Sequence, residues 1–108
     1  MKVEIAISDC YGSGLVASRK LVERLKEIKK EKGEEIDNSP FLTHVMRHDP
    51  DLIKCIKELG EKSNSPDPHI FSHIVVKEVE LPSGRYYIDN RDGKEEIIIP
   101  EEVNWTQV

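Results

Sequence analysis

The strongest candidate for chemistry in this sequence, the thiol of Cys10, lies in a glycine-containing turn between an apolar run and a helical pattern. A strand that passes through such a turn into a helix points backbone N–H groups and the positive end of the helix dipole at one place. That field would activate a thiol, and it would attract an anion or a partner's carboxylate. We therefore predict a ligand-binding site over this turn, formed by Cys10, Tyr11, Gly12, Ser13 and Gly14.

Catalysis by Cys10 would need a base and an oxyanion site within reach. His44 and His48 are the candidate bases, and the amides of residues 12–14 are candidate oxyanion donors. A phosphatase-like loop would also need an arginine six positions after the cysteine, where the sequence has Val16. A thiol packed beneath the turn explains Cys10 more simply. We therefore keep a cysteine-dependent hydrolase or transferase, with Cys10 as nucleophile and His48 as base, as an alternative to non-catalytic binding.

A second anion-binding signal stands before the next helical pattern. Asp49 is of a type that caps helices, and Pro50 suits the first helical position. If both helices begin at the same end of the sheet, Arg47 and His48 would meet the turn around Cys10. A planar guanidinium there could pair with a carboxylate or close an anionic pocket. We therefore add Arg47 and His48 to the site, on the condition that they share a cavity with the turn.

Two further residues, Arg85 and Tyr87, are second choices, because guanidinium and phenol groups can stack on a base or on a partner's ring. We expect Tyr86 to be in the core and Trp105 to attach the C-terminal tail to the sheet. The turn lacks the Gly-Lys-Ser/Thr of a phosphate loop and the third glycine of a dinucleotide loop. A plain tight turn therefore explains its glycines as well as contact with a nucleotide does.

The four histidines form two pairs, each with three residues between its members, which on paper suits zinc: His44 and His48, and His69 and His73. Pro50 argues against a shared helical face for the first pair, and the strand character of residues 69–73 argues against one for the second. We predict no metal and no cofactor.

Periodicity predicts the order strand, helix, helix and three strands, which is a small single α/β domain. We expect a mixed sheet of about four strands with the two helices packed on one face. Residues 33–40 are predicted to be a mobile linker, residues 41–46 a strand or an extended crossing segment, and residues 100–108 a C-terminal tail. The predicted elements are a strand at 2–8, a helix from Leu15 to Gly33, a helix from Pro50 to Gly60, a strand at 73–81 and a hairpin at 85–99.

The hairpin is the best-marked element, because Asp92-Gly93 favours a two-residue turn. Such a turn opposes Asp89 to Glu96, which is a repulsive pair, but it also places four apolar side chains on one face. The remaining predicted pairs are Arg91 with Lys94, Ile88 with Ile97, and Tyr86 with Ile99.

Length and charge limit the function classes. A chain of 108 residues suits one domain with one modest core. A net charge of −5 argues against binding a nucleic-acid duplex, which needs a basic face. No apolar run is long enough for a membrane span, and Glu4 interrupts the first apolar run, so we expect neither a membrane segment nor a secretory signal. Cys10 and Cys55 are too few for a disulfide scaffold, which favours reduced thiols and a cytoplasmic protein.

Several short motifs, in order along most of the chain, resemble a family of small uncharacterised proteins encoded mostly by tailed phages. That family has a Cys-Tyr-Gly-Gly-Phe-like turn, an Arg-x-Asp-Pro helix start, a Glu-Leu-Gly helix end, a Val-Val-Glu-Ile-Pro strand and an Asp-Gly hairpin. The turn here has Gly12-Ser13-Gly14 instead of Gly-Gly-Phe, so its shape is expected to differ. The matching segments are Asp9-Cys10-Tyr11-Gly12, Arg47-His48-Asp49-Pro50, Glu58-Leu59-Gly60-Glu61, residues 76–82 and residues 92–96.

The resemblance implies a phage or prophage setting and the cytoplasm of a host cell. Small phage proteins of this kind often bind a host factor or a signal molecule, and by analogy we expect the same here, in a role that suits counter-defence. The leading hypothesis is non-catalytic binding of a host protein or of a small anionic, nucleotide-like ligand. The alternatives are the cysteine-dependent enzyme and a structural or assembly protein that uses its sheet face, for which a homo-oligomer is left open.

Overall fold

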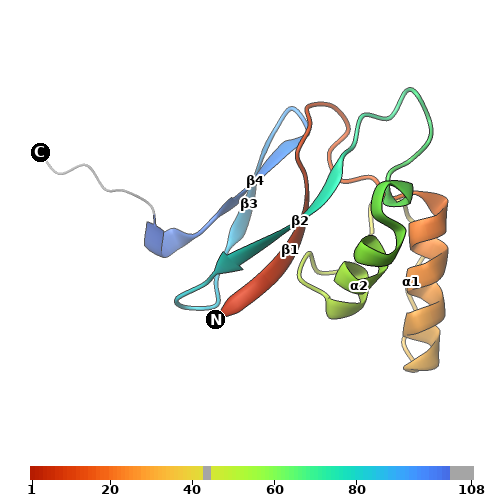
Figure 1. Ribbon diagram of the computed structural model, residues 1–108, viewed down its shortest axis with the longest axis horizontal. Coiled ribbons are helices and arrows are strands. Elements are labelled where there is room, and N and C mark those ends of the chain that lie inside the picture. The colour runs from red at the N-terminus through yellow and green to blue at the C-terminus, as the bar shows by residue number, and fades with distance from the viewer. Residues whose placement is uncertain (43–44, 103–108) are drawn as a thin grey trace, which may run out of the picture.

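The computed structural model describes residues 1–42 and 45–102, and it confirms a small α/β fold (Figure 1). The predicted roles of His44 and Trp105 fall outside these residues. Within them, no segment of 41–46 is helix or strand. The elements are β1 (Lys2–Ser8), α1 (Arg19–Glu31), α2 (Pro50–Leu59), β2 (Ile74–Glu80), β3 (Tyr87–Arg91) and β4 (Lys94–Ile98), with short 3-10 turns at Gly60–Ser63 and Pro100–Glu102.

The strands form two separate antiparallel pairs, β1 with β2 and β3 with β4, so the predicted single mixed sheet is not confirmed. Both helices cover one face of the β1–β2 pair, as predicted, and the β3–β4 hairpin covers the other face (Figure 1). β1 is therefore buried on both sides. Its Ala6 packs with the helices, whereas Ile5 and Ile7 pack with Leu81 and Ile99 beneath the hairpin.

The second edge of β1 explains why the hairpin did not extend the sheet. The Ala6 N–H donates to the Arg47 carbonyl at 2.9 Å, and the Ser8 N–H donates to the Glu95 carboxylate at 2.9 Å. Neither donor remains for a neighbouring strand. The apolar face of the hairpin therefore stacks over β1 instead of pairing with its edge.

The first helix begins at Arg19, not at the predicted Leu15. Ser18 is its N-cap and accepts a hydrogen bond from the Leu21 N–H at 3.1 Å. Tertiary partners hold the residues before it, because the Ala17 N–H donates to the Pro40 carbonyl at 2.7 Å. The helical spacing of residues 15–18 was therefore misleading, and the positive end of α1 lies four residues beyond the turn at 10–14.

The second helix begins as predicted. Asp49 caps it by accepting from the Asp51 N–H at 2.8 Å, Pro50 is its first residue, and Gly60 ends it with a positive φ of 54°. The cap also has a role that the sequence did not indicate. The buried ammonium of Lys29 contacts the carboxylates of Asp49 at 2.6 Å and Asp51 at 3.0 Å, and so joins the end of α1 to the start of α2.

Lys29 is charged because of these partners. Burial lowers its pKa, but the hydrogen bonds to Asp49 and Asp51 outweigh burial and hold the pKa above its usual value. Glu34 adds a third carboxylate at 3.3 Å, from the segment that follows α1. Residues 33–40 form neither helix nor strand, and Pro40 accepts the hydrogen bond from Ala17; their mobility stays a prediction.

The hairpin register is the predicted one. Arg91 pairs with Lys94 around Asp92 and Gly93, whose φ angles are 51° and 93°. Asp89 does lie opposite Glu96, and the Nε of Arg91 donates to Asp89 at 3.2 Å. This contact offsets the repulsion between the two carboxylates.

Candidate functional site

Three loop segments meet at one end of the β1–β2 pair: residues 9–14, 71–73 and 90–94. We call this surface the loop end. Backbone hydrogen bonds connect the segments, from the Ser13 N–H to the Phe71 carbonyl at 2.8 Å and from the Gly12 N–H to the Asp92 carbonyl at 2.5 Å. The predicted site residues Cys10 to Gly14 therefore sit together, on the tip of the hairpin.

Two glycines allow this close approach. Gly12 has φ of 136°, and a Cβ there would overlap Phe71. Gly93 is buried, and a Cβ there would overlap the backbone of Gly12. Glycine is thus required at these positions for packing between two loops, which accounts for Gly12 without any ligand.

Two amides at the centre of the turn are not free to bind an anion. The amides of Gly12 and Ser13 already donate to carbonyl groups, and the N-terminus of α1 lies at Ser18. The predicted contribution of the helix dipole is therefore absent from the turn, and the amides of Gly12 and Ser13 cannot serve as the predicted anion donors. The Ser13 hydroxyl also accepts from the Phe71 N–H at 3.1 Å, whereas the Tyr11 side chain is exposed.

Arg47 is held by a carboxylate of the protein itself. Its guanidinium binds Glu95 through two hydrogen bonds of 2.6 and 2.9 Å and also donates to the Ala6 carbonyl at 3.2 Å. Glu95 is 4% exposed and also accepts from the Ser8 N–H. Burial raises the pKa of Glu95, but Arg47 and the Ser8 N–H outweigh burial and hold the pKa below its usual value.

A chain of polar contacts joins Arg47 to the loop end. Glu95 contacts the Asn90 side-chain amide at 3.4 Å, and the Asn90 side-chain oxygen accepts from the Gly93 N–H at 2.9 Å. Gly93 packs on Gly12. Arg47 therefore supports the loop end through Glu95, and an anionic ligand would have to displace a buried carboxylate to reach its guanidinium.

The structure does not bring Cys10 and His48 together. His48 lies beside the first half of β1, where its Nδ1 contacts the Tyr86 hydroxyl at 2.6 Å. Cys10 follows the other end of the strand. From Glu4 to Ser8 alone the strand extends about 13 Å.

A different imidazole, that of His73, lies beside Asp9, the residue before Cys10 in the chain. His73 is the β-pair neighbour of Asp9, and its Nδ1 contacts the Asp9 carboxylate at 2.5 Å. The half-buried thiol of Cys10 is 4.0 Å from the Ser8 hydroxyl. Sequence spacing did not indicate the pair of Asp9 and His73, because 64 residues separate its members.

The second-choice residues lie away from the loop end. Tyr87 is 55% exposed at the start of β3, at the opposite end of the hairpin from Asp92. Arg85 precedes it and contacts Glu101 at 3.3 Å. Neither residue adds to the site around Cys10.

The loop end exposes two aromatic side chains on either side of Gly12. Tyr11 is 63% exposed and Phe71 is 61% exposed. The ammonium of Lys94 lies 5.4 Å from the centre of the Tyr11 ring, within the range of a cation–π interaction. Sequence reasoning selected Tyr11 and missed Phe71, whose only signal was an aromatic residue inside a polar loop.

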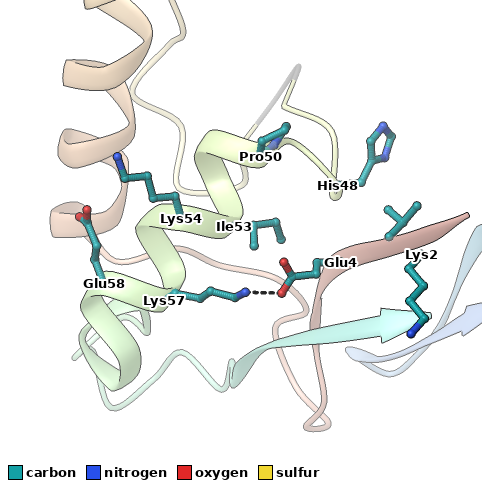
Figure 2. A pocket seen from close by; sticks show the side chains of 9 residues that line it. Lys2, Glu4, His48, Pro50, Ile53, Lys54, Lys57 and Glu58 are labelled. Atoms are coloured by element: carbon teal, nitrogen blue, oxygen red, sulfur yellow. Dashed lines mark ion pairs between the residues drawn. The ribbon is translucent and has the colours of Figure 1, made fainter. Parts of the chain in front are cut away.

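A second candidate region is a groove of about 630 Å³ between β1 and α2, shown in Figure 2. We call it the edge groove. His48 is the one predicted site residue that lines it. The lining residues are Lys2, Val3, Glu4, His48, Pro50, Ile53, Lys54, Lys57 and Glu58.

Among residues 1–42 and 45–102, no three His, Cys, Asp or Glu side chains are grouped so as to hold a metal ion. No helix in this part of the chain has the length and apolar character needed to cross a membrane. No protein-family model, curated protein or solved structure matches this chain.

Proposed function

We propose that this protein is a non-catalytic binding protein that docks on a protein of a host cell through the loop end. The observation that carries the proposal is the pair of exposed aromatic side chains, Tyr11 and Phe71, on a surface whose loops are tied to one another. Aromatic residues are enriched among those that dominate the energy of protein interfaces.

The way the loops are tied supports this function. Hydrogen bonds on both sides of Gly12 and the close contact with Gly93 hold the backbone under the aromatic side chains. A surface that is already ordered loses little conformational entropy when a partner binds. Lys94, stacked on Tyr11, adds a positive charge beside the ring.

A protein partner fits this surface better than a small anion does. The amides of Gly12 and Ser13 are used by carbonyl groups, and Arg47 is used by Glu95. The resemblance to tailed-phage proteins is the reason for proposing a host protein as the partner.

Site-specific photo-crosslinking tests the proposal. A photoreactive phenylalanine analogue replaces Tyr11 in one variant and Tyr87, which is similarly exposed, in a control. We expect one host protein to be linked through position 11 and not through position 87. For that purified protein, Tyr11→Ala and Phe71→Ala should each weaken binding about tenfold or more, and Tyr87→Ala should leave it unchanged. Equal losses for all three variants would contradict docking through the loop end.

The pair of Asp9 and His73, which directly precedes Cys10 in the chain through Asp9, suggests a second candidate, a cysteine-dependent hydrolase or transferase with His73 instead of His48 as its base. Alkylation by iodoacetamide between pH 5 and 9 distinguishes the two functions. Cys55 does not interfere, because burial raises its pKa to about 11. Fast labelling of Cys10 at low pH that slows in His73→Asn would support the enzyme, whereas equal rates in both proteins support binding without catalysis.

A further inference from the structure

The open edge of β1 is the most distinctive feature of the edge groove. Backbone bonds from Leu81 N–H to the Met1 carbonyl and from Asp9 N–H to the His73 carbonyl show that odd-numbered residues of β1 bond to β2. In an antiparallel pair, the residues between them turn their N–H and C=O groups to the opposite edge. Lys2 and Glu4 therefore present their backbone groups away from β2.

Part of this edge is already used and part is open. Arg47 pairs with Ala6 through its carbonyl and its guanidinium. The chain then turns away at His48 into α2. No residue in the described ranges 1–42 and 45–102 bonds to the backbone of Lys2 or Glu4 on this edge, so a row of donors and acceptors faces the groove.

The helix α2 forms the opposite wall of the groove. Figure 2 shows the Ile53 side chain between α2 and β1, with the ion pair of Lys57 and Glu4 joining helix and strand. Val3 and Pro50 add to the apolar lining. A groove with a strand edge on one side and a helix on the other is suited to an extended peptide, which adds a strand to the sheet and packs alternate side chains against the helix.

The charges of the groove select the kind of peptide. Both carboxylates of the lining are neutralised, Glu4 by Lys57 and Glu58 by Arg24. Lys2 and Lys54 form no ion pair within the described residues. The groove is therefore locally positive on a chain whose net charge is −5. Acidic side chains on a bound strand would be attracted to it, and basic ones would be repelled.

The geometry points to a peptide-binding site here: the edge groove takes an extended acidic segment of a partner protein as an added strand beside Lys2–Glu4. This site is separate from the loop end and does not depend on the function proposed for it. The acidic side chains of the bound segment lie on the helix side of the added strand, near Lys2 and Lys54.

Amide hydrogen exchange measured by NMR tests the mode of binding. In the free protein, the Glu4 amide should exchange quickly and the Ile5 amide, which bonds to β2, slowly. The probe is a capped Glu-Val-Glu-Val-Glu peptide at millimolar concentration. We expect it to slow exchange at Glu4 about tenfold or more, and we expect no effect from a Lys-Val-Lys-Val-Lys peptide. Binding without protection of the Glu4 amide would overturn strand addition.

Two matched controls separate strand addition from charge attraction. An acidic peptide N-methylated at alternate residues keeps its charge but cannot pair with Glu4, so equal binding by this peptide would overturn the proposal. The double variant Lys2→Glu/Lys54→Glu should weaken binding about tenfold or more, whereas Lys30→Glu on the exposed face of α1 should not. Equal losses in both would contradict binding in the groove.

A second copy of this chain is the competing occupant of the edge. Sedimentation of the free protein decides between a second copy and an acidic segment of a partner. A monomer whose Glu4 amide is protected only by the acidic peptide supports the proposal. A dimer whose formation protects that amide would overturn it, because the edge would then be an interface between two copies.

Discussion

The loop end and the edge groove are opposite in what they leave exposed. At the loop end the Gly12 and Ser13 amides donate to carbonyl groups of neighbouring loops, and the aromatic side chains of Tyr11 and Phe71 face outward. In the edge groove the backbone of Lys2 and Glu4 faces outward, beside a buried Ile53. The first surface suits recognition through side chains, and the second suits recognition through backbone hydrogen bonds.

The comparison shows that glycines and a reactive side chain do not by themselves mark an open site. The turn at 10–14 has both, yet its glycines serve the contact with the hairpin. The groove has no such motif and is formed by a strand that lacks a neighbour for part of its length. Arg47 and Glu95 lie between the two regions: Arg47 closes the strand edge at Ala6, and Glu95 contacts Asn90 below the loop end.

The largest effect is expected from breaking the ion pair of Arg47 and Glu95, which we call the junction between the two regions. Glu95→Ala leaves the half-buried Arg47 and the Ser8 N–H without their carboxylate, and should lower the free energy of unfolding by about 4 kcal/mol. Glu96→Ala, on the exposed side of the same strand, should change it by less than about 0.5 kcal/mol. Urea unfolding of both variants measures the difference, and similar values for the two would show that the junction is unimportant.

The contact between the turn and the hairpin should give the next largest effect. Gly93→Ala puts a Cβ at a residue whose positive φ is unfavourable for alanine, and this Cβ would overlap the Gly12 backbone. We therefore expect the free energy of unfolding to fall by about 3 kcal/mol. Gly33→Ala has a similar φ of 77° but open space around it, and should cost only about 1 kcal/mol. Thermal unfolding compares the two. If the two losses were equal, backbone conformation alone would explain both, and close packing at the loop end would be contradicted.

Acidification should weaken the same junction by a smaller amount. Because the pKa of Glu95 is lowered in the folded protein, its contribution to stability is complete above the unfolded value of about 4.5 and is lost as the pH falls below it. The stability difference between the wild-type protein and Glu95→Gln should therefore be constant from pH 7 to 5 and shrink towards pH 3. A difference that stays constant over the whole range would show that Glu95 does not titrate in this window.

The smallest effect is expected in the groove. Glu4→Gln breaks the exposed pair with Lys57, and should change the free energy of unfolding by no more than about 0.5 kcal/mol. The same variant should bind the acidic peptide at least as well as the wild-type protein does, because Lys57 is released. A large loss of stability would mean that the groove is part of the folded framework and not an open site.

Local chemistry explains why parts of the fold were predictable. Asp49 and Pro50 start α2 by interactions within four residues, and Asp92-Gly93 sets the register of the hairpin through its own backbone angles. The predicted start of α1 was wrong because the amides of residues 16 and 17 donate to Ser72 and Pro40, which are distant in the sequence.

The predicted site shows the same division between local contacts, which were predictable, and long-range contacts, which were not. The grouping of residues 10–14 follows from their being neighbours in the chain, but the partner of Arg47 is a carboxylate 48 residues away. Periodicity predicts which face of a strand is buried, and it says nothing about what lies along the strand's edge. For that reason neither Phe71 beside Gly12 nor the open edge at Glu4 could be seen before the structure.

The sequence by itself determined the α/β class, the boundaries of β1, the capped start of α2 and the register of the hairpin, because these depend on side-chain alternation and on short-range hydrogen bonds. The tertiary structure alone decided that the hairpin stacks on β1 instead of extending its sheet, and that Arg47 binds the Glu95 carboxylate. It also decided that the backbone groups of Lys2 and Glu4 are left unpaired at the edge of β1. Each of these outcomes depends on which groups, distant in the sequence, become neighbours in the folded chain. The order of residues along the chain does not contain that information.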